Sequence, residues 1–304
     1  MKKLLSHISI IAANLIWGLY ATICKDFLYS GHVGSWALCG IKMMGGAVLL
    51  WGLSALLPAS VAPREHVRTR DLPKLFLASM LINAGNQSCI IFGLKYTSPV
   101  SATVICSMAP IFTVVLAMLL YRQPLRPVKA IGVCIGFVGA LLLAVPDILT
   151  AGGTANTLMV GDKPLLGNAL VIASQIFGAL YLLLFTDLFT KYSAVTLVKW
   201  LFMLSALVLA PITAYDIIQT NWTTLSTSHW IQLGYIVVFA TGIAYLLLII
   251  GQKKVTATSI AMYNYVQPVT ATISSVAIGI VTITTQDLLA VLLCLVGVYI
   301  VIRR

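Results

Sequence analysis

The 304-residue sequence contains little charge, because only 9% of its residues are Asp, Glu, Lys or Arg, and only eight are acidic. A soluble domain carries roughly 25% charged residues, since its surface faces water. A chain this poor in charge lacks the residues for a water-facing exterior, whereas its 60% of hydrophobic residues suits lipid. We therefore predict an all-α integral membrane protein whose exterior contacts the lipid bilayer.

Carboxylates and imidazoles are missing from the interior of the long apolar segments. The acidic residues all fall in loops or at segment ends: Asp26, Glu65, Asp71, Asp147, Asp162, Asp187, Asp216 and Asp287. Hydrolysis within the membrane needs a general base or a metal cluster. The six cysteines show no metal-ligand spacing and indicate packing positions. We therefore predict no catalytic residues, no metal and no cofactor. The missing buried acids favour facilitated exchange or uniport over a proton relay, with coupling through Lys42, Lys199 or a loop acid as the alternative.

Ten apolar segments recur along the chain, and each is near the ~20 residues that cross a ~30 Å hydrocarbon core. They span residues 7–25, 33–57, 73–93, 99–121, 128–146, 165–186, 194–214, 230–250, 257–280 and 287–302. The first segment lacks a small-residue cleavage site, so we interpret it as an uncleaved helix rather than a signal peptide. The sequence thus predicts ten transmembrane helices.

The basic residues divide unevenly between alternate loops. With a cytoplasmic N-terminus, 14 of the 19 Lys and Arg residues fall in cytoplasmic segments and three in outer ones, with Lys42 and Lys199 inside spans. This asymmetry predicts a multi-pass protein of a bacterial-type inner membrane with both termini cytoplasmic. The net charge of +11 is explained by topology, so we expect no nucleic-acid partner.

An internal repeat appears when the chain is compared with itself at a shift of 158 residues. The gapless match pairs Gly93 with Gly251, Lys95 with Lys253, Ser101 with Ser259, Pro110 with Pro268, Val133 with Val291 and Gly139 with Gly297. Each half holds five helices, so the second enters the membrane inverted relative to the first. We predict a first repeat at 1–146, a linker at 147–164 and a second repeat at 165–304. Inverted repeats are typical of secondary transporters.

The order of several motifs resembles the drug/metabolite transporter superfamily in its EamA-type ten-helix branch. The resemblance covers nearly the whole chain, once per half. It rests on Asn14-Leu15-Ile16-Trp17-Gly18, Lys42, the stretch from Gly93 to Ala102, Pro110, and the glycines from Gly132 to Gly139. The Gly-Glu that usually follows the fourth helix is replaced here by Tyr121-Arg122-Gln123-Pro124, which leaves any role of that acid in doubt. The resemblance implies a permease for small metabolites, and it favours export.

Neutral polar residues gather on single faces of four predicted helices. Ten of them are the candidate substrate contacts: Asn14, Trp17, Asn83, Asn86, Gln87, Gln175, Tyr181, Tyr263, Asn264 and Gln267. Asn83, Asn86 and Gln87 illustrate the spacing, because i, i+3 and i+4 share one helix face. Hydrogen bonds between helices would explain any single residue. The set as a whole favours a polar central cavity, with a mixture of amides and aromatics that suits an amino acid or a similar molecule.

Two prolines and two lysines within the spans have two interpretations each. Pro110 and Pro268 are expected near the middle of the fourth and ninth helices, as plain kinks or as gating elements. Lys42 and Lys199 either extend to the membrane surface or contact an anionic group of the substrate.

The leading functional hypothesis is therefore a transporter that works by alternating access, with the substrate between the two repeats. A membrane-embedded enzyme acting on lipid is one alternative, although no base lies near a nucleophile. A non-transporting sensor or assembly subunit is another, although no break is long enough for a soluble domain. The oligomeric state stays open.

Overall fold

The computed structural model describes residues 2–56, 58, 63, 65–97, 99–122, 127–150 and 163–277, together with 289, 292–293, 295–297 and 299–300. In the first part of the chain the helices are α1 (Lys2–Tyr29), α2 (Ser35–Leu56), α3 (Leu72–Ser79), α4 (Asn86–Tyr96), α5 (Pro99–Cys106), α6 (Ala109–Tyr121) and α7 (Pro127–Thr150). In the second part they are α8 (Pro164–Leu184), α9 (Thr186–Lys191), α10 (Ala194–Gln219), α11 (Thr227–Gly234), α12 (Ala244–Gln252), α13 (Ala257–Met262) and α14 (Val266–Ala277). Short 3₁₀ and π-helical segments connect some of these helices, and no strand occurs among the described residues.

These helices cover nine of the ten predicted spans, whereas the tenth, residues 287–302, falls largely outside the described residues. Six helical stretches in the described chain are long and apolar enough to cross a membrane. They are Leu4–Tyr29, Ser35–Leu56, Thr69–Tyr96, Leu165–Leu184, Ala194–Gln219 and Thr227–Gln252. Most of the predicted linker, residues 151–162, also lies outside the described residues.

The predicted fourth and ninth spans are not continuous helices. The fourth is divided at Ser107 and Met108 into α5 and α6. In the ninth, a 3₁₀ turn at Tyr263–Tyr265 separates α13 from α14. Hydropathy does not register such breaks, because each whole segment stays apolar on average.

The expectation that the two prolines sit in mid-helix is wrong in detail. Pro110 is the second residue of α6 and Pro268 the third residue of α14. Proline is tolerated in the first turn of a helix, because the amide hydrogen it lacks has no intrahelical partner there. Each proline therefore begins the second half of a broken helix.

Two other spans contain π-helical turns. Met80–Gly85 joins α3 to α4, and Tyr235–Ile243 joins α11 to α12, so each span remains one rod. A π turn frees backbone groups from the regular ladder and is frequent at functional sites. The indole Nε1 of Trp17 donates to the Ala240 carbonyl at 3.0 Å within the second π segment.

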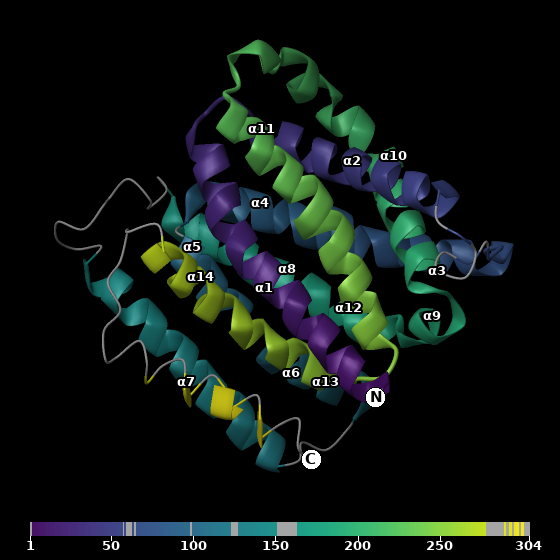
Figure 1. The fold of residues 1–304 in the computed structure, drawn as a ribbon. Helices are drawn as coiled ribbons and strands as arrows, with labels where there is room; N and C mark the ends of the chain where they lie inside the picture. The colour runs from purple at the N-terminus through teal and green to yellow at the C-terminus, as the bar shows by residue number, and fades with distance from the viewer. Residues whose placement is uncertain are drawn as a thin grey trace.

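The packing brings distant parts of the chain side by side. Helix α2 packs along α10, α4 along α8, and α1 lies between α12 and α14 (Figure 1). Gly18 permits the close contact with α14, since a Cβ there would lie 2.7 Å from Thr270 Cβ and 2.8 Å from the Gln267 carbonyl oxygen. In the helix α7, Gly136 lies against Gly297 and the ring of Tyr265.

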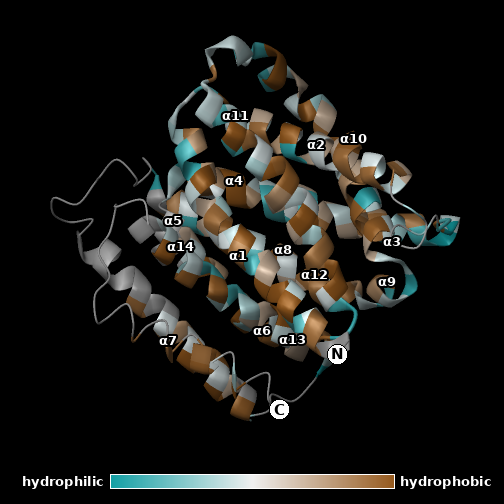
Figure 2. Cartoon of the chain, viewed as in Figure 1, coloured by the Kyte–Doolittle hydropathy of each residue, from teal (hydrophilic) through white to brown (hydrophobic). Residues whose placement is uncertain are grey.

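The exterior of the bundle is hydrophobic. Brown, apolar residues occur along the visible outer faces of the helices, and teal ones gather in several turns and helix ends (Figure 2). Large exposed apolar side chains include Val48, Leu56, Leu207, Ile218 and Ile231. Such a surface is unstable in water and suits hydrocarbon, so it fits a bundle embedded in lipid.

Candidate functional site

A cavity of about 120 Å³ lies among the helices of both halves of the chain. One water molecule needs roughly 10–15 Å³ on this measure, so the space suits a small solute. Its polar and aromatic lining residues are Trp17, Tyr20, Asn86, Gln87, Thr103, Cys106, Thr113, Gln175, Tyr181, Tyr245, Gln252, Asn264 and Gln267. Aliphatic side chains such as Ile82 and Leu248 fill the remainder.

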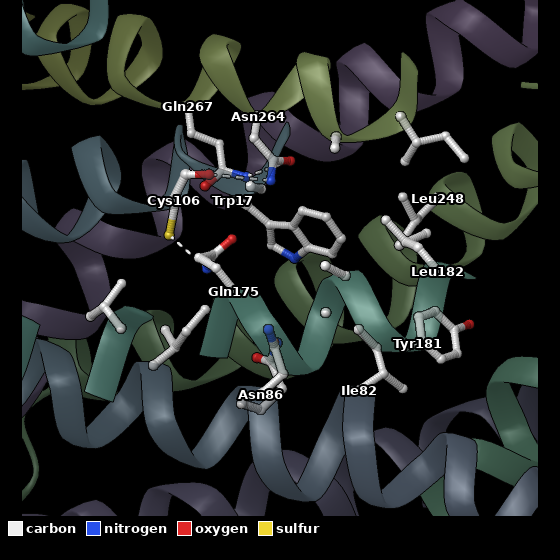
Figure 3. A pocket seen from close by; sticks show the side chains of 18 of the residues that line it. Trp17, Ile82, Asn86, Cys106, Gln175, Tyr181, Leu182, Leu248, Asn264 and Gln267 are labelled. Carbon is white, nitrogen blue, oxygen red and sulfur yellow. Dashed lines mark hydrogen bonds between the residues drawn. The ribbon is translucent and has the colours of Figure 1, made fainter. Parts of the chain in front are cut away.

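Seven of the ten candidate substrate contacts line this cavity: Trp17, Asn86, Gln87, Gln175, Tyr181, Asn264 and Gln267. Figure 3 shows Asn86 extending from one side and Asn264 with Gln267 from the other, with Gln175 and Trp17 between them. These residues come from α1, α4, α8, the 3₁₀ turn of the ninth span and α14. The amide faces identified in four separate spans therefore meet at one cavity.

The other three candidates have partners away from the cavity wall. Asn83 is fully buried and donates to the Ser205 hydroxyl of α10 at 3.3 Å. The Tyr263 hydroxyl lies 2.6 Å from Nδ1 of His7, near the start of α1. Asn14 stands behind Gln267, as described next.

The amides of the first and ninth spans hold each other in place. Gln267 Nε2 donates to Asn14 Oδ1 at 2.7 Å, and Asn14 Nδ2 donates to the Ile10 carbonyl at 2.9 Å. On another part of the wall, Gln175 Nε2 donates to the Ser174 hydroxyl at 3.0 Å and to Cys106 Sγ at 3.3 Å. These hydrogen bonds fix the side chains that face the solute space.

Tyr20 and Gln252 line the cavity although the sequence did not single them out. The buried Tyr20 hydroxyl interacts with the Cys24 thiol, a weak acceptor. Both amide atoms of Gln252 are buried and lack a hydrogen-bond partner among the described residues. Gln252 was missed because Lys253 and Lys254 follow it, so it resembled a helix end. Buried polar groups without partners are costly, and a bound ligand can satisfy them.

The two lysines within spans differ in their surroundings. The Lys42 ammonium is completely buried, donates to Gln87 Oε1 at 2.5 Å, and lies 4.1 Å from the centre of the Tyr20 ring. It therefore does not reach the membrane surface, and it sits directly behind the cavity wall. Lys199 instead donates to the Ser54 hydroxyl at 2.8 Å and lies over the Trp51 ring, away from the cavity.

A cluster of charged and polar residues joins the start of α3 to the α9–α10 connection. Asp71 accepts hydrogen bonds from Lys191 and from the Tyr192 hydroxyl, and Lys74 pairs with Asp187 at 2.8 Å. Burial, and then the hydrogen bond to the Asp71 carboxylate, raise the pKa of Tyr192 above its usual value. This cluster ties the two halves of the chain together at one end of the bundle.

The groups at the cavity wall are of the kinds that recognise a small solute. The cavity lining contains no Asp, Glu or His. Within the described residues, no group of three or more His, Cys, Asp and Glu side chains is placed to hold a metal ion. Amide, hydroxyl and aromatic groups bind and orient a solute.

Apolar helices with a hydrophobic exterior around a buried polar cavity define a multi-pass membrane protein. The EamA-like transporter family matches residues 4–145 and again residues 165–303. The chain therefore belongs to this family of membrane transporters, as the sequence motifs predicted.

Several curated relatives carry transporter names. An "Uncharacterized transporter" of Archaeoglobus fulgidus is 26% identical over 79% of this chain and 81% of its own length. The transporter YetK of Bacillus subtilis is 25% identical over 62% of this chain and 54% of its own length, and YyaM is 23% identical over 64% and 62%. Thus the chain spans less than two thirds of the two Bacillus proteins. One solved crystal structure, 18% identical, superposes on 100% of this chain and 99% of its own with a TM-score of 0.70, so the two share a fold.

Proposed function

We propose that this protein is an alternating-access permease that exports small metabolites such as amino acids through the cavity between its two repeats. The cavity carries the proposal, because both halves of the chain contribute to its lining and the buried amide atoms of Gln252 on its wall have no hydrogen-bond partner among the described residues. The proposed contacts are Trp17, Asn86, Gln87, Gln175, Tyr181, Asn264 and Gln267, supported from behind by Asn14, Asn83 and Tyr263.

The proposed architecture is ten transmembrane helices in two inverted five-helix repeats. The irregular features support it, because they recur at the same shift of 158 residues as the sequence match. The end of α5 at Cys106 falls on Asn264, within the 3₁₀ turn of the ninth span. The π segment Met80–Gly85 falls on 238–243, inside Tyr235–Ile243. The breaks beside Pro110 and Pro268 would act as gating joints of the two halves.

The contacts between helices also support two structurally equivalent halves. The third span packs on the sixth through α4 and α8, and the eighth packs on the first through α12 and α1. The fourth packs on the sixth through α5, α6 and α8, and the ninth packs on the first through α14 and α1. Pairs related in this way are expected for two equivalent halves. Alternating access would exchange their conformations.

Transport by purified protein in proteoliposomes tests the function. Efflux and uptake are measured for a panel of labelled amino acids and other small metabolites, and we expect transport of at least one class. Asn86→Ala and Gln87→Ala should each lower that transport about tenfold, as the loss of one hydrogen bond of roughly 1.4 kcal/mol implies. Gln219→Ala, an exposed amide at the end of α10, is the matched control and should transport normally. A folded protein that moves no member of the panel would refute the proposal.

Topology is tested separately. Both termini are proposed to be cytoplasmic, in a bacterial-type inner membrane. A cysteine introduced at position 162 should react with an impermeant reagent added from outside intact cells and not from inside inverted vesicles. Labelling from the opposite side would reverse the proposed orientation.

A further inference from the structure

The buried ammonium of Lys42 has no acidic partner among the residues that the structure describes. Its side chain is 0% exposed, and its two contacts in the structure are the Gln87 amide oxygen and the face of the Tyr20 ring. The ion pairs found among the described residues are Lys74–Asp187 and Lys191–Asp71. A buried charge without a counter-charge is costly, so this position favours an anion nearby.

A directed chain of hydrogen bonds runs from Lys42 along the cavity wall. Lys42 Nζ donates to Gln87 Oε1, Gln87 Nε2 donates to Asn86 Oδ1 at 2.7 Å, and Asn86 Nδ2 donates to the Ser174 backbone carbonyl at 2.7 Å. Both ends determine this direction, because an ammonium only donates and a carbonyl only accepts. Lys42 therefore fixes the orientation of both amides.

This orientation gives the wall an excess of donors. Each primary amide has two N–H groups, and Gln87 and Asn86 each use one of them within the chain. Both residues line the cavity, so the second N–H of each remains for a ligand. The Tyr20 hydroxyl also lines the cavity and interacts with the Cys24 thiol, a weak hydrogen-bond acceptor that a ligand anion can replace. The cavity wall carries no acid that would repel an anion.

We infer that the substrate carries a carboxylate, which binds to the donor wall formed by Tyr20, Asn86 and Gln87. Lys42 is a positioning residue: it supplies the positive charge behind the wall and orients the two amides. One lysine with three neutral donors matches a single carboxylate group. The inference rests on the proposed permease function and adds the chemical class of its substrate.

Lys199 provides a matched control for Lys42. The two lysines correspond within the internal repeat, yet the Lys199 ammonium binds Ser54 and lies over Trp51, and it does not approach the cavity. A change at Lys199 alters the buried charge of the bundle without altering the donor wall.

The test compares carboxylates with their carboxamides. Leucine, phenylalanine and threonine, and the three corresponding amino-acid amides, are offered to proteoliposomes containing wild type, Lys42→Met, Lys42→Arg or Lys199→Met. We expect wild type and Lys199→Met to prefer the carboxylate by about tenfold or more, since the amide lacks the anion that the donors bind. Lys42→Met should bring this ratio close to one, and Lys42→Arg should retain more of it. If Lys42 had a purely structural role, its replacement would lower the transport of the carboxylate and of the carboxamide alike and leave their ratio unchanged.

Gln87→Glu keeps the size of the side chain and places a carboxylate beside Lys42. It should therefore abolish the preference for carboxylates over carboxamides while Lys42 itself is retained. Thermal stabilisation of purified protein by the same six compounds measures binding even where transport fails. Equal stabilisation by carboxylates and amides, or a ratio unaffected by Lys42→Met and Gln87→Glu, would overturn the inference while leaving a permease intact. Selective binding without any transport would instead count against the permease function alone.

Discussion

Replacing Gly18 by alanine should disturb the contact between α1 and α14. The new Cβ would lie 2.7 Å from Thr270 Cβ and 2.8 Å from the Gln267 carbonyl oxygen. Carbon atoms in contact normally lie 3.5–4.0 Å apart, so α14 must move away by about 1 Å. Overpacking of this kind costs about 1–3 kcal/mol. Alanine is about 1 kcal/mol better than glycine within a helix, so the net destabilisation is about 0–2 kcal/mol.

A matched variant separates the steric cost of the new Cβ from the gain in helix propensity. Gly52 in α2 is exposed and has no atom within 4 Å of its position for a Cβ. Gly52→Ala therefore gains the propensity without the clash, and its free energy of unfolding should exceed that of Gly18→Ala by about 1–3 kcal/mol. Reversible denaturation in mixed micelles measures the difference.

The same displacement should reach the cavity. A retreat of about 1 Å would stretch the 2.7 Å bond between Gln267 and Asn14, so Gly18→Ala should lower transport, whereas Gly52→Ala should not. Two alanine variants with equal stability and equal transport would show that α1 and α14 are not packed at the distance described here.

Two further changes probe the periphery and the wall of the cavity. The raised pKa of Tyr192 means that the folded protein holds this proton more tightly than the unfolded chain does. The contribution of this proton to stability is full below the ordinary tyrosine pKa of about 10 and is lost as the pH rises further. Above pH 10 the thermal midpoint of Tyr192→Phe should therefore fall less than that of the wild type. Parallel curves of midpoint against pH for the two proteins would contradict this. Gln252→Met should raise the thermal midpoint and lower transport, because it removes two buried polar atoms without partners; a lower midpoint in this variant would mean that the amide is satisfied.

The helical spans followed from the sequence because a bilayer imposes a minimum length of apolar residues. The inward direction of the amide faces also followed, since an unsatisfied amide is excluded from lipid. The same rule does not say which inner neighbour each amide meets. Asn83 and Asn86 share a predicted face, yet Asn83 binds Ser205 of α10 and Asn86 reaches the cavity.

The remaining features depend on contacts between segments far apart in the chain. The break at Ser107 and Met108 leaves no trace in hydropathy, because it concerns which carbonyl each amide hydrogen meets. Lys42 and Lys199 are equivalent in the repeat and differ only through their tertiary partners. For Gln252, a position beside two lysines suggested a loop, whereas α1 and the neighbouring helices enclose it.

The unpaired charge of Lys42 also has an electrical consequence. When a substrate with a net charge of −1 is bound beside it, the centre of the protein is neutral, whereas the empty protein carries one positive charge there. A zwitterionic amino acid leaves that charge in place. A full crossing of the membrane by one charge is worth about 2.3 kcal/mol per 100 mV. Any movement of α2 through part of that field therefore makes the return of the empty protein sensitive to voltage, while the step loaded with a net anion is not. The resting membrane potential of the cell would then influence the rate of the transport cycle without any coupling ion.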